Sequence, residues 1–214
     1  MLTSIIHKNK LAGSEENTAS WRLVYLLNYY RLALSLLLVI LSLSGLLFKP
    51  LASHRPELFI VSSALYFVVG VLIHTLLFRR KPDLGSQIYI NVISDIVFVT
   101  LLMHASGGIG SGLGSLMVIT IVCGSILLSG RAAFLPAALA SLAILAEQAY
   151  AQISGHAETN SFLQSGILGI TFFATSILAI VLSWRLQESE ALAKKQSVDL
   201  ANMAQLTEYT IQRM

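Results

Sequence analysis

Lysine and arginine are distributed unevenly around a series of long uncharged segments, and this pattern constrains the fold most. Of 14 Lys and Arg residues, only Lys49 and Arg55 fall outside if the first segment begins inside the cell. The inner twelve are Lys8, Lys10, Arg22, Arg31, Arg79, Arg80, Lys81, Arg131, Arg185, Lys194, Lys195 and Arg213. Because Lys and Arg in short loops orient helices during insertion, we expect a multi-pass inner-membrane protein with cytoplasmic N and C termini.

The uncharged segments predict an all-α membrane protein, a bundle of six transmembrane helices. The chain is 55% hydrophobic and only 12% charged, far from the composition of a soluble domain. Each segment can cross a hydrocarbon core about 30 Å thick with some tilt or local thinning. The predicted helices are about 32–48, 58–78, 86–105, 113–129, 132–153 and 162–183.

Three regions follow from this pattern. Residues 1–19 are polar and read as a flexible cytoplasmic leader. Residues 20–183 form the membrane domain, which begins with an interfacial helix at 20–31. In that helix Trp21, Tyr25 and Tyr29 share one face, as expected for aromatic anchors at the level of the lipid headgroups.

Residues 184–214 are predicted to continue the last segment as a cytoplasmic signalling helix. Its best heptad seam is formed by Leu186, Ala193, Leu200, Met203 and Met214. Polar residues interrupt the seam, namely Ser189, Gln196, Thr207 and Thr210. We therefore expect a weak coiled coil that dimerises with help from its neighbours. Arg185, Leu186, Leu200 and Met203 are the candidate residues for signal transmission, and we expect the chain to be truncated before the part that the helix acts on.

Asp95 lies in the middle of the third segment and is the strongest candidate for a sensing residue. A carboxylate at this depth costs about 2.5–3.5 kcal/mol on insertion scales. We therefore expect Asp95 to face other helices, where it is hydrogen-bonded or protonated. Asn91 shares its helix face at a spacing of four residues. A structural contact between helices and a stimulus-sensitive switch both remain open.

Five glycines within residues 106–115 predict a tight outer turn between segments three and four. The turn either packs helices closely or presents a surface to a ligand or partner. The candidate residues are Gly107, Gly108, Gly110, Ser111, Gly112 and Gly114. His104 lies beside this turn and is a candidate sensing residue. Glu147, in segment five, is expected to lie near enough to the outer surface to reach headgroups.

Several classes of chemistry have no support in the sequence. Cys123 is alone, so neither an intramolecular disulfide nor a multi-cysteine metal site can form. His74, His104 and His156 lack metal-binding spacing. The basic residues lie beside membrane segments, which indicates contact with the lipid bilayer and not with nucleic acid. No catalytic residue, cofactor or metal ligand is predicted in this chain.

The sequence resembles the membrane-spanning sensor region of PilS-type histidine kinases, which control type IV pilus genes in Gram-negative bacteria. The matching stretches are Asn28–Arg31, Asp95–Ile96, Ala105–Gly114, Gly130–Arg131, Glu147–Gln148, Phe172–Thr175, Arg185–Ala193 and Asp199–Met214. The resemblance implies a parent protein whose PAS and kinase domains use ATP and Mg²⁺ and pass phosphate to a PilR-type response regulator. It also implies a homodimer in the bacterial inner membrane and pilin subunits as a candidate stimulus.

We therefore expect the chain to be the input module of such a sensor, without enzymatic activity of its own. The alternative is a small proton-coupled transporter that uses Asp95 and Glu147. The absence of detectable repeats and the signalling-type helix after Trp184 argue against a transporter.

Overall fold

The computed structural model describes residues 2–44, 54–79, 84–128, 130–155 and 161–211, and this part of the chain contains helices and no strand. Backbone groups in lipid have no water to bond, so long apolar segments bond internally as helices. The elements are α1 (Leu2–Leu43), α2 (Pro56–Phe78), α3 (Leu84–Ala105), η1 (Gly108–Ser111), η2 (Leu113–Leu116), α4 (Met117–Leu127), η3 (Gly130–Phe134), α5 (Leu135–Ile153) and α6 (Ser161–Ile211).

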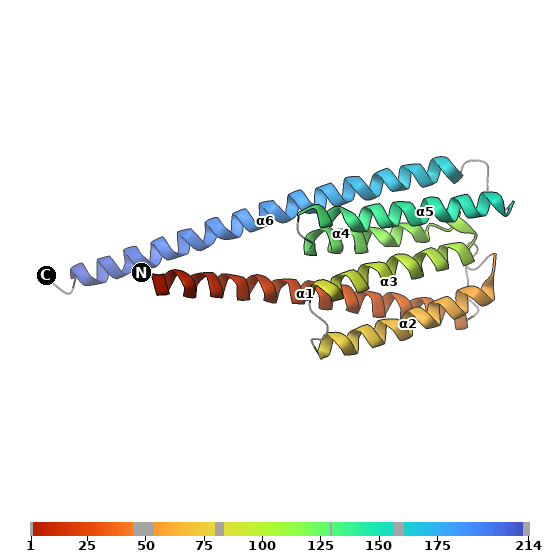
Figure 1. Cartoon of the computed structure of the whole chain (residues 1–214). Coiled ribbons are helices and arrows are strands. Elements are labelled where there is room, and N and C mark those ends of the chain that lie inside the picture. Colours follow the sequence, from red (N-terminus) through yellow and green to blue (C-terminus); the bar gives the residue numbers. More distant parts are fainter. Residues whose placement is uncertain (1, 45–53, 80–83, 129, 156–160, 212–214) are drawn as a thin grey trace.

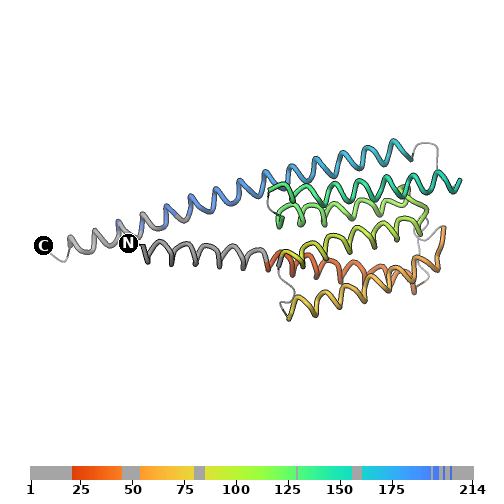
Figure 2. The backbone as a smooth tube through the Cα atoms, viewed as in Figure 1, coloured from red at the N-terminus to blue at the C-terminus, as the bar shows by residue number. Residues whose placement is uncertain are grey.

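The helices run side by side as a bundle, and α6 continues far beyond it (Figure 1). The same side-by-side packing is seen in Figure 2, and in Figure 1 the amino end of α1 and the carboxyl end of α6 leave the same end of the bundle. Five stretches are long and apolar enough to cross a membrane, and Leu113–Leu127 forms a shorter apolar sixth. An all-α bundle of membrane helices is thus confirmed.

The third helix lies at the centre of the bundle and the sixth at its edge. In the most apolar window of α3, 56% of the residues are buried inside the protein, against 22% in that of α6. Met103, Met117, Ile144 and Phe172 are fully buried and come from α3, α4, α5 and α6. Large apolar side chains also cover the outside, as a lipid-facing surface requires.

Gly124 allows three helices to approach closely in this core. A Cβ atom at Gly124 of α4 would lie 2.7 Å from Cγ of Pro136 and 3.0 Å from Cγ2 of Val92. Those neighbours belong to α5 and α3. Small residues at such positions let helix backbones pack tightly in membranes.

The first helix differs from the predicted boundaries. We expected an interfacial helix at 20–31 and a separate span at 32–48, but α1 is continuous from Leu2 to Leu43. The candidate span is Trp21–Leu43, so Arg31 lies near its middle. The prediction began the span after Arg31 because a charge normally marks a membrane surface. The structure places the balancing charge inside the bundle instead.

Smaller differences occur at the fourth and fifth segments. Residues 113–116 of the predicted helix 113–129 form the 3-10 turn η2, and α4 ends at Leu127. Pro136 lies in the first turn of α5, which begins at Leu135 and not at residue 132. Proline favours this position because it lacks the N–H that a first turn leaves unbonded. The division into leader, membrane domain and signalling helix remains a prediction.

Candidate functional site

A buried ion pair lies near the middle of the membrane bundle. Nε of Arg31 on α1 donates to Oδ1 of Asp95 on α3 over 2.6 Å. The exposed fractions of the two side chains are 0% and 2%. Opposite charges at this depth persist because each offsets the desolvation of the other. The pair therefore joins α1 to α3 by a charge-assisted hydrogen bond.

Two further helices complete the bonding of the Asp95 carboxylate. The Tyr66 hydroxyl on α2 donates to Oδ1 over 2.9 Å, and Thr120 Oγ1 on α4 donates to Oδ2 over 3.0 Å. Arg31 Nη2 also donates to the backbone carbonyl of Asn91 over 2.6 Å. We call these five residues the Arg31 cluster. It binds α1, α2, α3 and α4 together through one carboxylate.

The sequence placed Asp95 correctly in a polar contact between helices but missed its partners. Asn91 was expected only to share the helix face of Asp95, and its side chain donates to the Gln87 carbonyl of α3 itself. Its contribution to the cluster is its backbone carbonyl. The signal that could have found the partner was charge complementarity. Arg31 lies at the middle of the apolar run Trp21–Leu43, and Asp95 lies at the middle of segment three with the opposite charge.

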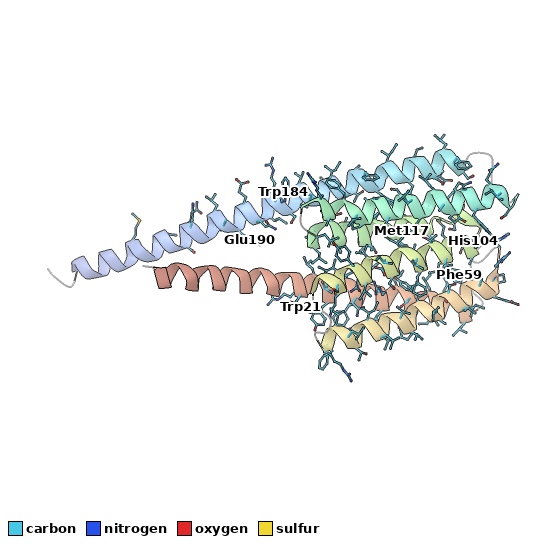
Figure 3. All side chains as sticks on the ribbon, viewed as in Figure 1. Trp21, Phe59, His104, Met117, Trp184 and Glu190 are labelled. Carbon is cyan, nitrogen blue, oxygen red and sulfur yellow. The ribbon has the colours of Figure 1, made fainter. Side chains whose placement is uncertain are left out.

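A second polar cluster lies at the opposite end of the bundle from Trp21 and Trp184 (Figure 3). His104 Nδ1 on α3 lies 3.3 Å from Glu147 Oε1 on α5. Glu147 is only 7% exposed. It was expected to lie near enough to the outer surface to reach headgroups, and its carboxylate is largely buried beside His104 at this end of the bundle. These two predicted residues, far apart in sequence, therefore meet.

A cavity of about 80 Å³ adjoins this pair. It is lined by His54, Arg55, His104, Gly107, Gly108, Glu147, Tyr150, Ala151 and Ser154. The His54 and Tyr150 rings each meet the His104 ring edge to face, with centroids 6.3 and 5.5 Å away. Neither His54 nor Arg55 was a candidate site residue from the sequence, because a connecting loop carries no periodic signal. We call this space the outer-end cavity.

The glycine turn has the tight conformation that the sequence predicted. Gly107, Gly108 and Gly112 have φ angles of 91°, 85° and 74°, a region that side chains disfavour. Ser111 Oγ donates to the Gly108 carbonyl over 2.7 Å. The remaining candidates differ: Gly114 packs against Leu168 and Met103, whereas a Cβ at Gly110 would meet nothing within 4 Å.

The candidate transmission residues all lie on α6. This helix is one unit of 51 residues from Ser161 to Ile211, in agreement with a predicted continuation past Trp184. Arg185, Leu186, Leu200 and Met203 are exposed. Leu186, Leu200 and Met203 therefore present apolar surface on the outside of a single chain. Their role in transmission remains a prediction.

Metal binding has no support in the part of the chain that the structure describes, where no three His, Cys, Asp or Glu side chains gather. His74 Nδ1 instead lies 2.9 Å from Asn28 Nδ2, which joins α2 to α1. Cys123 is a free, partly buried thiol on α4. His156 lies outside the described residues.

Comparisons with known proteins agree with this architecture. The family model described as "PilS-like transmembrane domain" matches residues 13–193. The chain is also similar to the "Sensor protein kinase PilS" of Pseudomonas aeruginosa, with 35% identity over 205 residues. That match covers 96% of this chain and 38% of the relative. No solved structure matches. The chain belongs to the family of PilS-like transmembrane domains.

Proposed function

We propose that this chain is the transmembrane input module of a two-component histidine kinase. The family match over residues 13–193 carries the proposal, because it covers the bundle and the first residues of α6 beyond it. The similar protein from Pseudomonas aeruginosa is a sensor protein kinase, and the chain spans 38% of its length. By analogy, the parent would use ATP and Mg²⁺ and pass phosphate to a PilR-type response regulator.

The proposed orientation puts both termini in the cytoplasm of a bacterial inner membrane. Arg79 and Arg131 follow α2 and α4, and Arg185 follows the apolar part of α6. In an alternating bundle these positions belong to the end where α1 starts and α6 leaves (Figure 1). Positive residues in short loops stay on the cytoplasmic side, which supports this orientation.

The proposed mechanism is a shift or rotation of α6 within a homodimer. α6 has no Pro or Gly after Gly169, so a displacement within the membrane would be carried along one helix. Its exposed Leu186, Leu200 and Met203 provide apolar surface for a second α6. A weak seam suits two states of similar free energy, which a stimulus can rebalance. Pilin subunits in the membrane are the proposed stimulus.

The test is a series of deletions of one to seven residues around Lys194 in the full-length parent protein. If α6 transmits its rotational phase, kinase output changes with a period of about seven residues, the heptad repeat. A seven-residue deletion, which removes about two full turns, restores output, while deletions of two or five residues, which rotate the helix by roughly half a turn, do not. Immunoblotting of each variant controls for protein amount. A smooth decline with deletion length would show that α6 is only a tether.

A further inference from the structure

The outer-end cavity lies where a membrane surface meets the bundle. Arg55 immediately precedes the span Pro56–Phe78, and the spans that contain α3 and α5 end at Ala105 and Ile153. The Arg55 N–H donates to the Ala105 carbonyl over 3.0 Å, which holds Arg55 against the end of α3. Residues at the ends of such spans lie at the depth of the lipid headgroups. A ligand that enters here therefore comes from the lipid interface or from the water beside it.

The cavity carries two opposite charges that the protein leaves incompletely bonded. Oε2 of Glu147 is buried and has no hydrogen-bond partner among the described residues. Its other oxygen has a single long contact, 3.3 Å, with His104. The exposed Arg55 guanidinium forms no ion pair within the described part of the chain. An unpartnered buried carboxylate oxygen is costly unless a donor reaches it.

We propose that the outer-end cavity binds the zwitterionic headgroup of an ethanolamine phospholipid. The primary ammonium donates hydrogen bonds to Glu147, and the adjacent phosphate accepts from Arg55. The last torsion of a glutamate side chain is soft, so a small rotation turns a carboxylate oxygen toward the cavity. The rings of Tyr150 and His104 line the same space, and the Tyr150 ring attracts a cation that approaches its face.

Other ligand chemistries fit the same groups less well. A phosphate without an ammonium would meet the carboxylate of Glu147, whereas a simple cation would leave Arg55 unpaired. A choline headgroup carries a positive charge but no N–H group for the carboxylate. The volume of about 80 Å³ accommodates several water-sized groups, which suits the short arm of an ethanolamine headgroup. This inference does not depend on the proposed function.

The test measures which lipids stay bound to the purified full chain. The protein is equilibrated in detergent with equal amounts of phosphatidylethanolamine, phosphatidylcholine and phosphatidylglycerol of identical acyl chains, and bound lipid is counted by native mass spectrometry. We expect ethanolamine lipid to exceed choline lipid about tenfold, the ratio that one charged hydrogen bond provides. Equal retention of the three lipids would overturn the proposal.

Two variants separate the roles of the charges. Glu147→Gln reduces the preference for ethanolamine over choline, because a neutral amide oxygen accepts a weaker hydrogen bond from the ammonium N–H than a carboxylate does. Arg55→Gln lowers the retention of both lipids about equally, because both carry the phosphate; Arg55 is exposed, so this change leaves folding intact. Glu57→Gln at the same end and Arg79→Gln at the other end are matched controls that retain wild-type binding. A loss in the controls equal to that in the cavity variants would contradict the assignment.

A third arm distinguishes a lipid from a free zwitterion. Soluble O-phosphoethanolamine is added in increasing excess to protein that holds ethanolamine lipid. Retention of the lipid, whose acyl chains add apolar contact with the bundle, supports a membrane source. Full displacement at stoichiometric concentration would show that the cavity prefers a free zwitterion and would contradict the lipid assignment.

Discussion

The Arg31 cluster and the contacts of α6 hold the bundle together in different ways. The cluster joins four helices through one charged carboxylate and a buried guanidinium. In contrast, α6 meets its neighbours through uncharged groups: Ser176 Oγ lies 2.8 Å from Ser125 Oγ, and Ser141 Oγ donates to the Gly169 carbonyl over 3.4 Å. Hydrogen bonds of this neutral kind contribute only about 0.6 kcal/mol each in membrane proteins.

This difference suggests which part of the bundle moves. A buried ion pair resists separation, because pulling the charges apart leaves both desolvated and unpaired. Neutral serine contacts can break and form again at small cost, and little of α6 is buried. We therefore expect α1–α4 to act as a fixed unit and α6 to shift against it.

The largest expected effect follows from breaking the ion pair. Arg31→Leu or Asp95→Leu should each destabilise the bundle by about 3–5 kcal/mol, because the remaining charge is buried without a partner. The measurement is unfolding of the purified chain in mixed micelles. The double variant Arg31→Leu/Asp95→Leu is the matched control and should lose less than the sum of the single changes. Additive losses would show that the pair is not coupled.

The ion pair also changes an expectation for Asp95→Asn. The sequence alone indicates a mild effect, since asparagine keeps hydrogen-bonding capacity. In the structure this change leaves Arg31 buried and uncompensated, so we expect a loss close to that of Asp95→Leu. A stability like that of the wild type would count against the charge-based account of the cluster.

An intermediate effect is expected where the glycine turn meets α5. Gly108 has φ +85°, and a Cβ there would lie 3.6 Å from Oε1 of Glu147. Gly108→Val should therefore cost about 1–3 kcal/mol through backbone strain. Gly110→Val is the matched control, because Gly110 lies in the same turn with open space around it. Thermal unfolding of both variants checks this, and equal losses would show that the turn conformation is incidental.

The smallest expected effect concerns the contact of α6 with α4. Ser176→Ala should lower stability by about 0.6 kcal/mol, the average for a hydrogen bond between membrane helices. In a full-length kinase reporter the same change should nevertheless alter the output, because it frees α6. Thr171→Ala, on the exposed face of α6, is the control and should leave output unchanged. Unaltered output from Ser176→Ala would weaken the idea that neutral contacts hold α6 in one state.

The sequence predicted the helical class and the contact of Asp95 because both follow from the cost of polar groups in lipid. The sequence did not predict that Arg31 lies within the first membrane span. A rule that ends apolar spans at charges treats each helix alone, whereas the pairing of Arg31 with Asp95 depends on residues 64 positions apart. The partners Tyr66 and Thr120 are ordinary components of membrane helices, so only the packed structure reveals them.

The outer-end cluster was predictable in part. His104 and the glycine turn adjoin each other in sequence, and their proximity was expected. The contact with Glu147 depends on how α5 packs against α3, for which a single sequence gives no register. Arg55 and His54 line the cavity where the Arg55 N–H donates to the Ala105 carbonyl, a contact between residues far apart in the sequence.

The most direct test of the account compares two distances in the full-length protein. Spin labels are attached in pairs, at exposed Arg22 on α1 together with either Glu188 on α6 or Arg79 after α2. The protein carries Cys123→Ala, which removes its own thiol, and labelled chains are diluted with unlabelled chains. Pulsed dipolar spectroscopy then compares variants locked in kinase-active and kinase-silent states. We predict that the 22–188 distance changes by about 1–2 Å or more, the scale of helix shifts in switching proteins, while the 22–79 distance stays constant. A constant 22–188 distance, or an equal change in 22–79, would contradict a moving α6 on a fixed unit.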